Sequence, residues 1–374
     1  MLKNIKAEKK IYYIITTLLG VALLGIPLAR YVVYFLPVIV IFIALLFRCL
    51  TFNFNRVVAP FILIILVSLP TAYEYDINSI KKLLFVTAYS SIFLFIDFSK
   101  VKINFHYYGA VLFTVLLWEV GISYLGMHEQ VIKYSIIDSK SIFESTLAFP
   151  FAMLCSYYIL QSRWLLSFVH FIMVAITLKR IALIAILITL LSRLVPRKVR
   201  NIIFSPYIIT SLSIILTSIT IYFAYGGLDD QVSEIFNRSA NELSQGRQLL
   251  WNRALTGVDY EFMDYLFYGS GVGNVATVLE DHYGGSRILL HNDILVILIE
   301  YGFIILIFFL FLLLNQKTFE QKVMALALLT LLFTDNVIIY QHVMITYFFI
   351  QSQFTRENYM KRLHNKQHKP ASVK

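Results

Sequence analysis

Arginines are the side chains of this chain best suited to chemistry, and they are concentrated in its one long polar segment, residues 225–287. The segment contains Arg238, Arg247, Arg253 and Arg287, no lysine and nine acidic residues. A guanidinium group presents a planar fork of donors that binds phosphate or carboxylate oxygens in pairs, whereas a merely solvated surface mixes arginine with lysine. The segment therefore predicts an anion-binding site.

A histidine follows this segment at the start of a long apolar run. His291 and Asn292 precede a stretch that contains Glu300 and Gly302. On one continuous helix His291 and Gly302 would fall within about 20° of each other, and the glycine would let another helix pack closely there. Imidazole titrates near neutral pH and can act as a general base. The alternative is an interfacial histidine that caps a helix.

Other polar positions could contact a substrate or serve the fold. Trp251 lies four residues after Arg247, where it could bind a sugar beside a phosphate or pack the segment onto the rest of the chain. Glu300 would lie about 18 Å along its helix, where it could face a polar cavity or pair with an arginine of another helix. Lys179 and Arg180 interrupt an apolar run, where they could bind an anionic group at the membrane surface or extend toward water.

No motif for a metal or a nucleotide accompanies these residues. The sequence has no HExxH, CxxC or P-loop pattern, and Gly269–Gly273 does not follow a strand of a βαβ unit. Cys49 and Cys155 both lie in apolar stretches, which indicates neither a disulfide nor a metal site. The net charge of +10 suits anionic lipid. We therefore expect no cofactor, no metal and no nucleic-acid partner.

The elements that must position these residues are transmembrane helices. The chain is 59% hydrophobic and only 14% charged, against about 25% charged residues in soluble domains. A helix needs roughly 20 apolar residues to cross a membrane. Candidate spans occur at 11–29, 31–50, 57–70, 80–96, 105–125, 141–160, 164–178, 181–195, 201–223, 288–314, 323–338 and 340–353. The sequence thus predicts an all-α, polytopic transmembrane bundle of about twelve spans.

The stretch 164–195 decides the topology, because it could form one overlong helix or two short ones. Two helices keep the basic residues at 193–200 on the cytoplasmic side, as the positive-inside tendency favours. Residues 1–224 then hold nine spans, 225–287 form one large external loop, 288–355 hold three spans and 356–374 form a basic cytoplasmic tail. Both termini would be cytoplasmic. Within the loop, Asp230–Asn237 and Gln245–Leu255 are predicted to be short helices.

Four motifs follow one another between residues 140 and 350. They are Thr177-Leu178-Lys179-Arg180-Ile181-Ala182-Leu183, Gln245-Gly246-Arg247 with Leu250-Trp251, Gly269-x-Gly271-x-Gly273, and His291-Asn292 with Glu300 and Gly302. In this order and topological placement they resemble the bacterial O-antigen polymerase and O-antigen ligase superfamily. The resemblance implies a metal-independent glycosyltransferase of the bacterial inner membrane. Its active site would face the periplasm, and its donor would be a glycan on undecaprenyl pyrophosphate.

The resemblance also implies roles for particular residues. Arg180 and Arg247 match the phosphate-handling arginines of the superfamily, and His291 matches the histidine proposed to activate the acceptor hydroxyl. Further candidates for substrate binding are Lys179, Trp251, Arg253, Arg287, Asn292 and Glu300. The expected partners are the lipid-linked oligosaccharide or polysaccharide, membrane lipids and a chain-length regulator protein.

Two branches of the superfamily differ in their motifs. The ligase pattern reads His, then Asn, Ser or Gln, nine residues, Gly, two residues, then Gly, Thr or Tyr. Here His291, Asn292 and Gly302 fit, but Ile305 occupies the last position. The run Gly246-Arg247-x-x-Leu250-Trp251, followed by Gly269-x-Gly271-x-Gly273, looks more like the polymerase branch. The resemblance therefore favours a polymerase of repeat units over a ligase that transfers the glycan to lipid A core. A flippase for lipid-linked oligosaccharides is the alternative of another class, although transporters concentrate charge near the bilayer midplane.

Overall fold

The structure of the protein is a computed structural model of the 374-residue chain. It describes residues 2–24, 32–70, 77–126, 145–258, 263–286 and 288–367. Within these ranges the regular elements are all helices, and none is a β-strand. The expected all-helical fold class is therefore confirmed.

Every apolar segment singled out in the sequence contains a helix. These helices are α1 (Leu2–Leu23), α2 (Val32–Leu46), α3 (Ala59–Ser68), α4 (Ile77–Phe95), α5 (Phe105–Gly126), α6 (Ala148–Leu160), α7 (Trp164–Thr177), α8 (Arg180–Leu194), α10 (Pro206–Ala224), α15 (Asp293–Leu314), α16 (Phe319–Leu332) and α17 (Gln341–Gln367). Several are shorter than the apolar run that predicts them. The clearest case is the segment 323–338, which is wrong as a single helix because α16 ends at Leu332.

Shorter helices complete the chain. Outside the segment 225–287 they are η3 (Phe98–Lys100), α9 (Arg197–Ile203) and η5 (Val337–Ile339). Within it they are α11 (Asp229–Phe236), α12 (Ala240–Leu243), α13 (Arg247–Thr256), the π-helix η4 (Asp264–Tyr268) and α14 (Asn274–His282). The two helices predicted for this segment are confirmed as α11 and α13, whereas α12, η4 and α14 were not foreseen.

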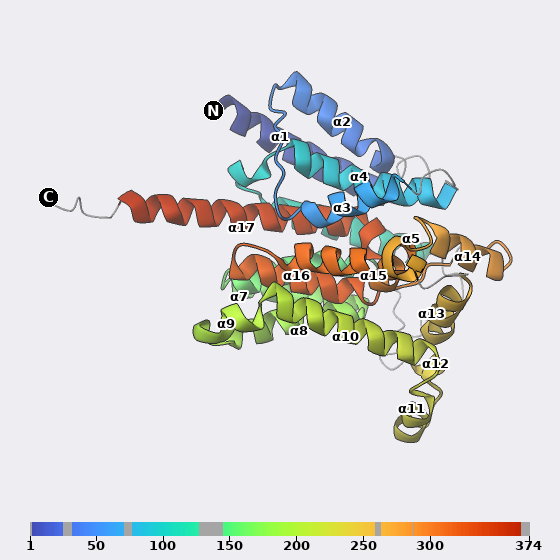
Figure 1. Ribbon diagram of the computed structural model, residues 1–374. Coiled ribbons are helices and arrows are strands. Elements are labelled where there is room, and N and C mark those ends of the chain that lie inside the picture. Colours follow the sequence, from blue (N-terminus) through green and yellow to red (C-terminus); the bar gives the residue numbers. More distant parts are fainter. Residues whose placement is uncertain are drawn as a thin grey trace.

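The long helices form one bundle whose two ends carry different parts of the chain (Figure 1). The N-terminus, α9 and the C-terminal part of α17 lie at one end, which we call the terminal end. The helices α11 to α14 lie at the other, which we call the loop end. Between them, buried aromatic rings of α3, α4 and α17 pack together, as in the contacts of Phe61 with Tyr89 and of Phe93 with Phe348.

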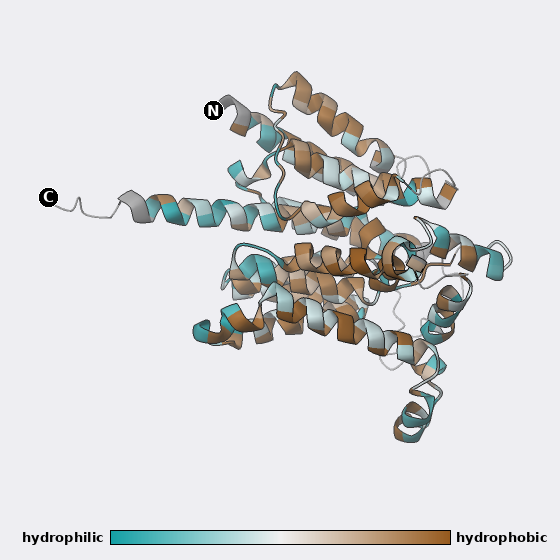
Figure 2. Ribbon diagram, in the orientation of Figure 1, coloured by the Kyte–Doolittle hydropathy of each residue, from teal (hydrophilic) through white to brown (hydrophobic). Residues whose placement is uncertain are grey.

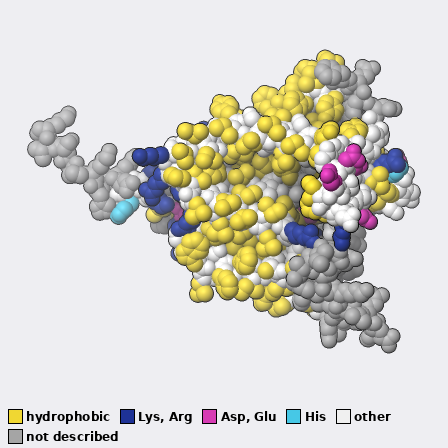
Figure 3. Space-filling model, turned by 90° about the horizontal axis from the view of Figure 1, so that it is seen from below, with side chains coloured by type: hydrophobic (Ala, Val, Ile, Leu, Met, Phe, Trp, Pro, Cys, Tyr) yellow, Lys and Arg dark blue, Asp and Glu magenta, His cyan; other side chains and the backbone are white. Residues whose placement is uncertain are grey.

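The face of the bundle seen in Figure 3 is largely apolar. Figure 2 shows hydrophobic residues along the helices between the two ends, and in Figure 3 hydrophobic side chains cover the visible face of the bundle, with Lys and Arg gathered where α17 leaves it. Leu165 of α7 and Leu194 of α8 are 76% and 77% exposed, which would be costly in water. Three helices of the described residues, α5, α10 and α15, are long and apolar enough to cross a membrane. These features indicate a membrane protein, and the twelve-span count stays a prediction.

The polar pair at 179–180 separates two helices. α7 ends at Thr177, and Leu178 adopts the left-handed conformation (φ 54°) that closes a helix. Lys179 is extended and precedes the first residue of α8. Both helices pack against α6. The prediction of two short helices over 164–195 is therefore confirmed.

The helix α15 is broken at Gly302, whose φ of 83° and ψ of 168° are not helical. The glycine-rich loop at 269–273 packs against this break. The Ser270 N–H donates to the Ile299 carbonyl oxygen at 2.9 Å, and the Gly271 N–H donates to the Glu300 carbonyl oxygen at 3.0 Å. A break leaves such carbonyls without helical donors. The loop therefore supplies donors to the broken helix.

The break overturns one prediction from helical periodicity. His291 and Gly302 do not share a face of one continuous helix, because α15 begins only at Asp293 and its backbone changes direction at the glycine. The glycine does permit the close packing expected there, and its partner is the end of the π-helix η4 together with Gly269, the residue that follows it. A Cβ at Gly302 would lie 3.1 Å from the backbone carbon of Phe267.

The closest approach of the loop to α15 is at Gly269. A Cβ there would lie 2.3 Å from the Glu300 carbonyl carbon, whereas at Gly284, with almost the same φ, no atom lies within 4 Å. Gly284→Ala should lower the free energy of unfolding by about 1 kcal/mol through its left-handed backbone. Gly269→Ala should lower the free energy of unfolding by about 1–3 kcal/mol more than Gly284→Ala, because its added methyl group overpacks the contact with Glu300. Thermal unfolding of both variants in detergent tests this, and equal losses would contradict the packing argument.

Candidate functional site

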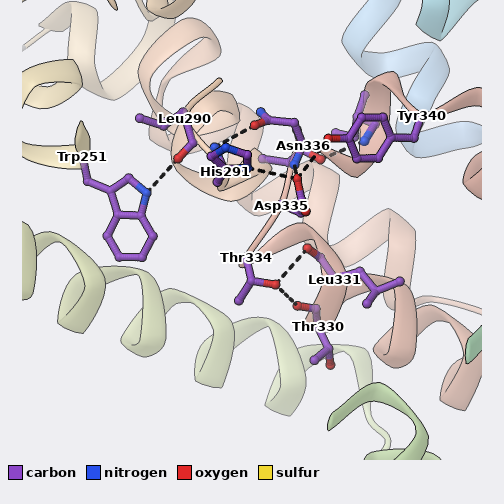
Figure 4. A network of polar contacts seen from close by, with 11 residues as sticks. Trp251, Leu290, His291, Thr330, Leu331, Thr334, Asp335, Asn336 and Tyr340 are labelled. Carbon is purple, nitrogen blue, oxygen red and sulfur yellow. Dashed lines mark hydrogen bonds and ion pairs between the residues drawn. The ribbon is translucent and has the colours of Figure 1, made fainter. Parts of the chain in front are cut away.

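His291 lies in the turn before α15, held from one side by the loop that joins α16 to η5 (Figure 4). Its backbone N–H donates to the Asn336 side-chain oxygen at 2.7 Å. Its ring nitrogen Nδ1 lies 3.2 Å from the Asp335 carboxylate oxygen Oδ1. The His291 side chain is 39% exposed, but that of Asp335 is only 6% exposed. The imidazole is therefore fixed through Nδ1 and open to solvent elsewhere.

Asp335 is the centre of this polar cluster. Its Oδ1 also accepts from the Tyr340 hydroxyl at 3.2 Å and from the Asn336 N–H at 2.8 Å. Burial alone would raise the pKa of the Asp335 carboxyl. The hydrogen bonds from His291 and the Asn336 N–H, with the charges of His291 and Lys179, instead hold that pKa below its usual value. A carboxylate that stays ionised accepts Nδ1–H, which leaves Nε2 of the imidazole as the basic nitrogen.

The residues that follow His291 fix the start of α15. Asn292 is 1% exposed, and its side-chain oxygen accepts the Leu295 N–H at 3.0 Å as an N-cap. The Asp293 carboxylate accepts the Ile338 N–H at 2.8 Å and so ties α15 to η5. The helix-capping role weighed in the sequence thus belongs to Asn292. Its side chain is buried in the fold rather than displayed beside the imidazole.

The junction of α7 and α8 approaches the same cluster. Lys179 is near enough to Asp335 to help lower the pKa of its carboxyl, although the two are far apart in sequence. Arg180 follows directly as the first residue of α8 and is exposed. The structure therefore brings the cationic pair and the histidine to one region of the bundle.

The helix α13 joins this region through Trp251. The indole Nε1 donates to the carbonyl oxygen of Leu290, the residue before His291, at 2.9 Å. The ring also lies edge-on to Phe223 of α10, with centroids 6.1 Å apart. Trp251 thus packs the segment 225–287 onto the bundle. Arg247 lies one turn earlier on α13 and is half-exposed.

The remaining arginines differ in placement. Arg253 is exposed and lies about 200° around α13 from Trp251, away from its contact with Leu290. Arg287 lies outside the described residues. Among the side chains that the structure describes, neither Arg247 nor Arg253 forms an ion pair with a carboxylate.

Glu300 is separate from the histidine cluster. Its carboxylate forms an ion pair with Lys82 of α4 and accepts the backbone N–H groups of Gly273 and Val275 at the start of α14. The Glu300 side chain is 1% exposed and that of Lys82 is 14% exposed. A carboxylate at a helix N-terminus is stabilising. Glu300 therefore joins α4, α14 and the break in α15. Of the two roles considered for it, the structure shows the pairing with a cation of another helix, and that cation is a lysine rather than an arginine.

This ion pair makes a stability prediction. Lys82→Met keeps the side-chain stem but leaves the Glu300 carboxylate buried without its cation, which should cost about 3–5 kcal/mol in free energy of unfolding. The matched control is Lys100→Met, which removes the more exposed pair with Asp97 at 3.1 Å and should cost about 0–1 kcal/mol. Denaturant unfolding in detergent measures both. Similar small losses would show that Glu300 is not tied as the contacts indicate.

The chain matches no protein-family model and no curated protein. In the part of the chain that the structure describes, no group of three or more His, Cys, Asp or Glu side chains could hold a metal ion.

Sequence reasoning missed the residues that hold the histidine. The predicted apolar segments 323–338 and 340–353 contained Asp335, Asn336 and Tyr340, so these residues were not singled out. Lys82, the partner of Glu300, was likewise counted as part of the apolar segment 80–96. One signal could have identified them: a charged side chain within an apolar segment is costly unless it has a partner. An aspartate beside an asparagine at 335–336, and two lysines at 81–82, each needed a partner.

Proposed function

We propose that the protein is an inner-membrane glycosyltransferase that polymerises undecaprenyl-pyrophosphate-linked repeat units of O-antigen on the periplasmic side. The observation that carries the proposal is the pairing of the half-exposed His291 imidazole with the buried Asp335 carboxylate, beside the cationic pair at 179–180. The order of motifs along the chain supports the same activity. No metal is needed for the roles assigned below.

In this mechanism His291 is the general base. Asp335 accepts Nδ1–H, so the lone pair of Nε2 can take the proton of a sugar hydroxyl on the incoming lipid-linked repeat. As that oxygen bonds to the anomeric carbon of the growing chain, the bond from this carbon to the pyrophosphate oxygen breaks. The carboxylate stabilises the imidazolium that forms. The growing chain is thereby transferred onto the new unit.

The cations stabilise the leaving group. The undecaprenyl pyrophosphate gains negative charge as its bond to the sugar breaks, and preorganised cationic donors lower the energy of that transition state. Arg180 and Arg247 take this role, with Lys179 beside them. The exposed apolar surface of the helices suits the polyprenyl chain of the same substrate.

The proposal requires a defined topology. Both termini and α9 lie in the cytoplasm, the helices α11 to α14 lie in the periplasm, and the twelve apolar helices cross or enter the membrane. In support of it, the start of α1, α9 and the C-terminal part of α17 share one end of the bundle, while α11 to α14 lie at the other. The basic residues Arg197, Lys198 and Arg200 are on α9 at the terminal end, as the positive-inside tendency favours.

Arg247 provides a test of phosphate binding. Arg247→Lys keeps the charge but loses the paired donors of the guanidinium, and should lower the rate of polymerisation about tenfold to a hundredfold, the worth of one hydrogen bond to a charged group. The control is Arg238→Lys in the same segment, where the side chain is exposed and has no assigned role. Near-normal chain lengths in the Arg247→Lys strain would remove the arginine from the mechanism.

Deleting the gene and displaying the lipopolysaccharide of the source bacterium on a gel tests the function as a whole. Core carrying a single repeat unit is the expected result and identifies a polymerase. Bare core with accumulated lipid-linked polymer would identify a ligase instead, which the match of His291, Asn292 and Gly302 to the ligase pattern makes the second candidate. Accumulation of repeat units on the cytoplasmic face would indicate a flippase. An unchanged ladder would exclude all three.

A further inference from the structure

A cavity of about 1050 Å³ lies at the terminal end of the bundle. It is bounded by α1, the segment around η3, the starts of α5 and α7, the end of α6 and the outer part of α17. None of the residues of the His291 cluster lines it. The proposed function leaves this cavity without a role.

The lining of the cavity is cationic. Its charged residues are Lys9, Lys100, Lys102, Arg163 and Arg356, against the carboxylates Asp97 and Glu357. Both carboxylates already have partners. Asp97 pairs with Lys100 at 3.1 Å, and Glu357 accepts hydrogen bonds from Tyr157, Gln161 and Gln353. Among the side chains that the structure describes, the other four cations form no ion pair.

A buried tyrosine in the lining points to a missing polar partner. Tyr158 of α6 lines the cavity and is only 1% exposed. Its hydroxyl has no hydrogen-bond partner among the described residues. Burying a hydroxyl without a partner is costly. A ligand with acceptor oxygens would satisfy this hydroxyl and the four cations together.

We propose that this cavity binds a phosphate group carried by the headgroup of an anionic phospholipid. Phosphate oxygens pair with guanidinium and ammonium groups. The apolar side chains of Ile5 and Met360 share the lining with the cations, which suits an amphiphile better than a free ion. The cavity also lies at the end of the apolar surface, where the headgroups of a bilayer would lie, and basic pockets between membrane helices bind such headgroups.

Native mass spectrometry of the purified full-length protein tests the proposal, with phosphatidylglycerol or phosphatidylcholine added. The wild-type protein should retain phosphatidylglycerol in preference to phosphatidylcholine. The triple variant Lys102→Gln, Arg163→Gln, Arg356→Gln should bind it on the order of a hundredfold more weakly. The control Arg197→Gln, Lys198→Gln, Lys361→Gln removes the same charge at the same end but outside the cavity, and should keep the wild-type affinity.

A second variant guards against misfolding of the triple variant. Tyr158→Phe removes only the hydroxyl that lacks a partner, so it should not lower the melting temperature, and it should weaken phosphatidylglycerol binding about two- to tenfold. Displacement of the lipid by inorganic phosphate would assign the same site to a soluble phosphate. Equal binding of the two lipids, equal losses in both triple variants, or unchanged binding in Tyr158→Phe would overturn the proposal. The His291 cluster takes no part, so polymerase activity does not bear on the outcome.

Discussion

Replacing His291 by asparagine is expected to lower the rate of polymerisation by about 10²–10⁴-fold, the usual contribution of a general base. Asparagine is the suitable replacement because the backbone at this position has a φ of 55°, a region that asparagine tolerates. Its side-chain amide can still donate to Asp335, but it offers no basic nitrogen for the acceptor hydroxyl. The variant thus removes proton transfer while the fold is kept.

The measurement uses purified enzyme and the lipid-linked repeat units that accumulate in a strain lacking the gene. The rate is the appearance of dimers and longer chains on a gel. His282→Asn on α14 is the matched control, since that side chain is exposed in the same segment of the chain. Its rate should equal that of the wild type. A His291→Asn enzyme with undiminished turnover would exclude the histidine as the base.

The positions of the helices could be predicted from the sequence because apolar length is a local property. Even the separation of α7 from α8 was predictable, since Lys179 and Arg180 cannot be placed in the middle of an apolar helix without cost. The break in α15 was not. A lone glycine inside an apolar run is compatible with a continuous helix. The broken form is favourable only because the loop at 269–273 supplies N–H donors to the carbonyl oxygens of Ile299 and Glu300.

The candidate site could be predicted only in part, for the same reason. His291, Lys179 and Arg180 stand out by residue type beside apolar runs. Asp335 could not be assigned to His291, because the contact joins residues 44 apart in sequence. The contact forms because α16 ends at Leu332 and the following residues are a loop, although the apolar pattern in the sequence continues past Leu332. Pairings between distant polar residues are set by tertiary packing, which a single sequence does not show.

The position of Trp251 in the sequence is compatible with two different roles. Its spacing from Arg247 allows either a contact with a sugar or a packing contact. The hydrogen bond from its indole to the Leu290 carbonyl favours packing, since this contact holds the turn that carries His291. The tryptophan is thus a positioning residue, and it links the folding of the segment 225–287 to the geometry of the candidate site.

Asp335→Asn should also lower the rate of polymerisation by about 10²–10⁴-fold, although Asp335 does not touch the substrate. The asparagine amide has the same shape but can donate to Nδ1 of His291, which places the imidazole proton on Nε2 and removes the basic lone pair. The carboxylate that stabilises the imidazolium is lost as well. The loss should appear in kcat, with KM little changed, because Arg180 and Arg247, the residues proposed to bind pyrophosphate, remain in place.

The same substitution has a second readout in the acid stability of the fold. The pKa of Asp335 is lowered in the folded protein, so its ionised form adds stability that is fully present above the pKa of an unfolded aspartate, about 4. This contribution is lost as the pH falls through the lower folded value. The difference in unfolding free energy between wild type and Asp335→Asn should therefore be present at neutral pH and should shrink as the pH falls below about 4. The exposed Asp281→Asn should show no such difference. A change in KM alone, or a pH-independent difference, would mean that Asp335 does not position His291 as a carboxylate.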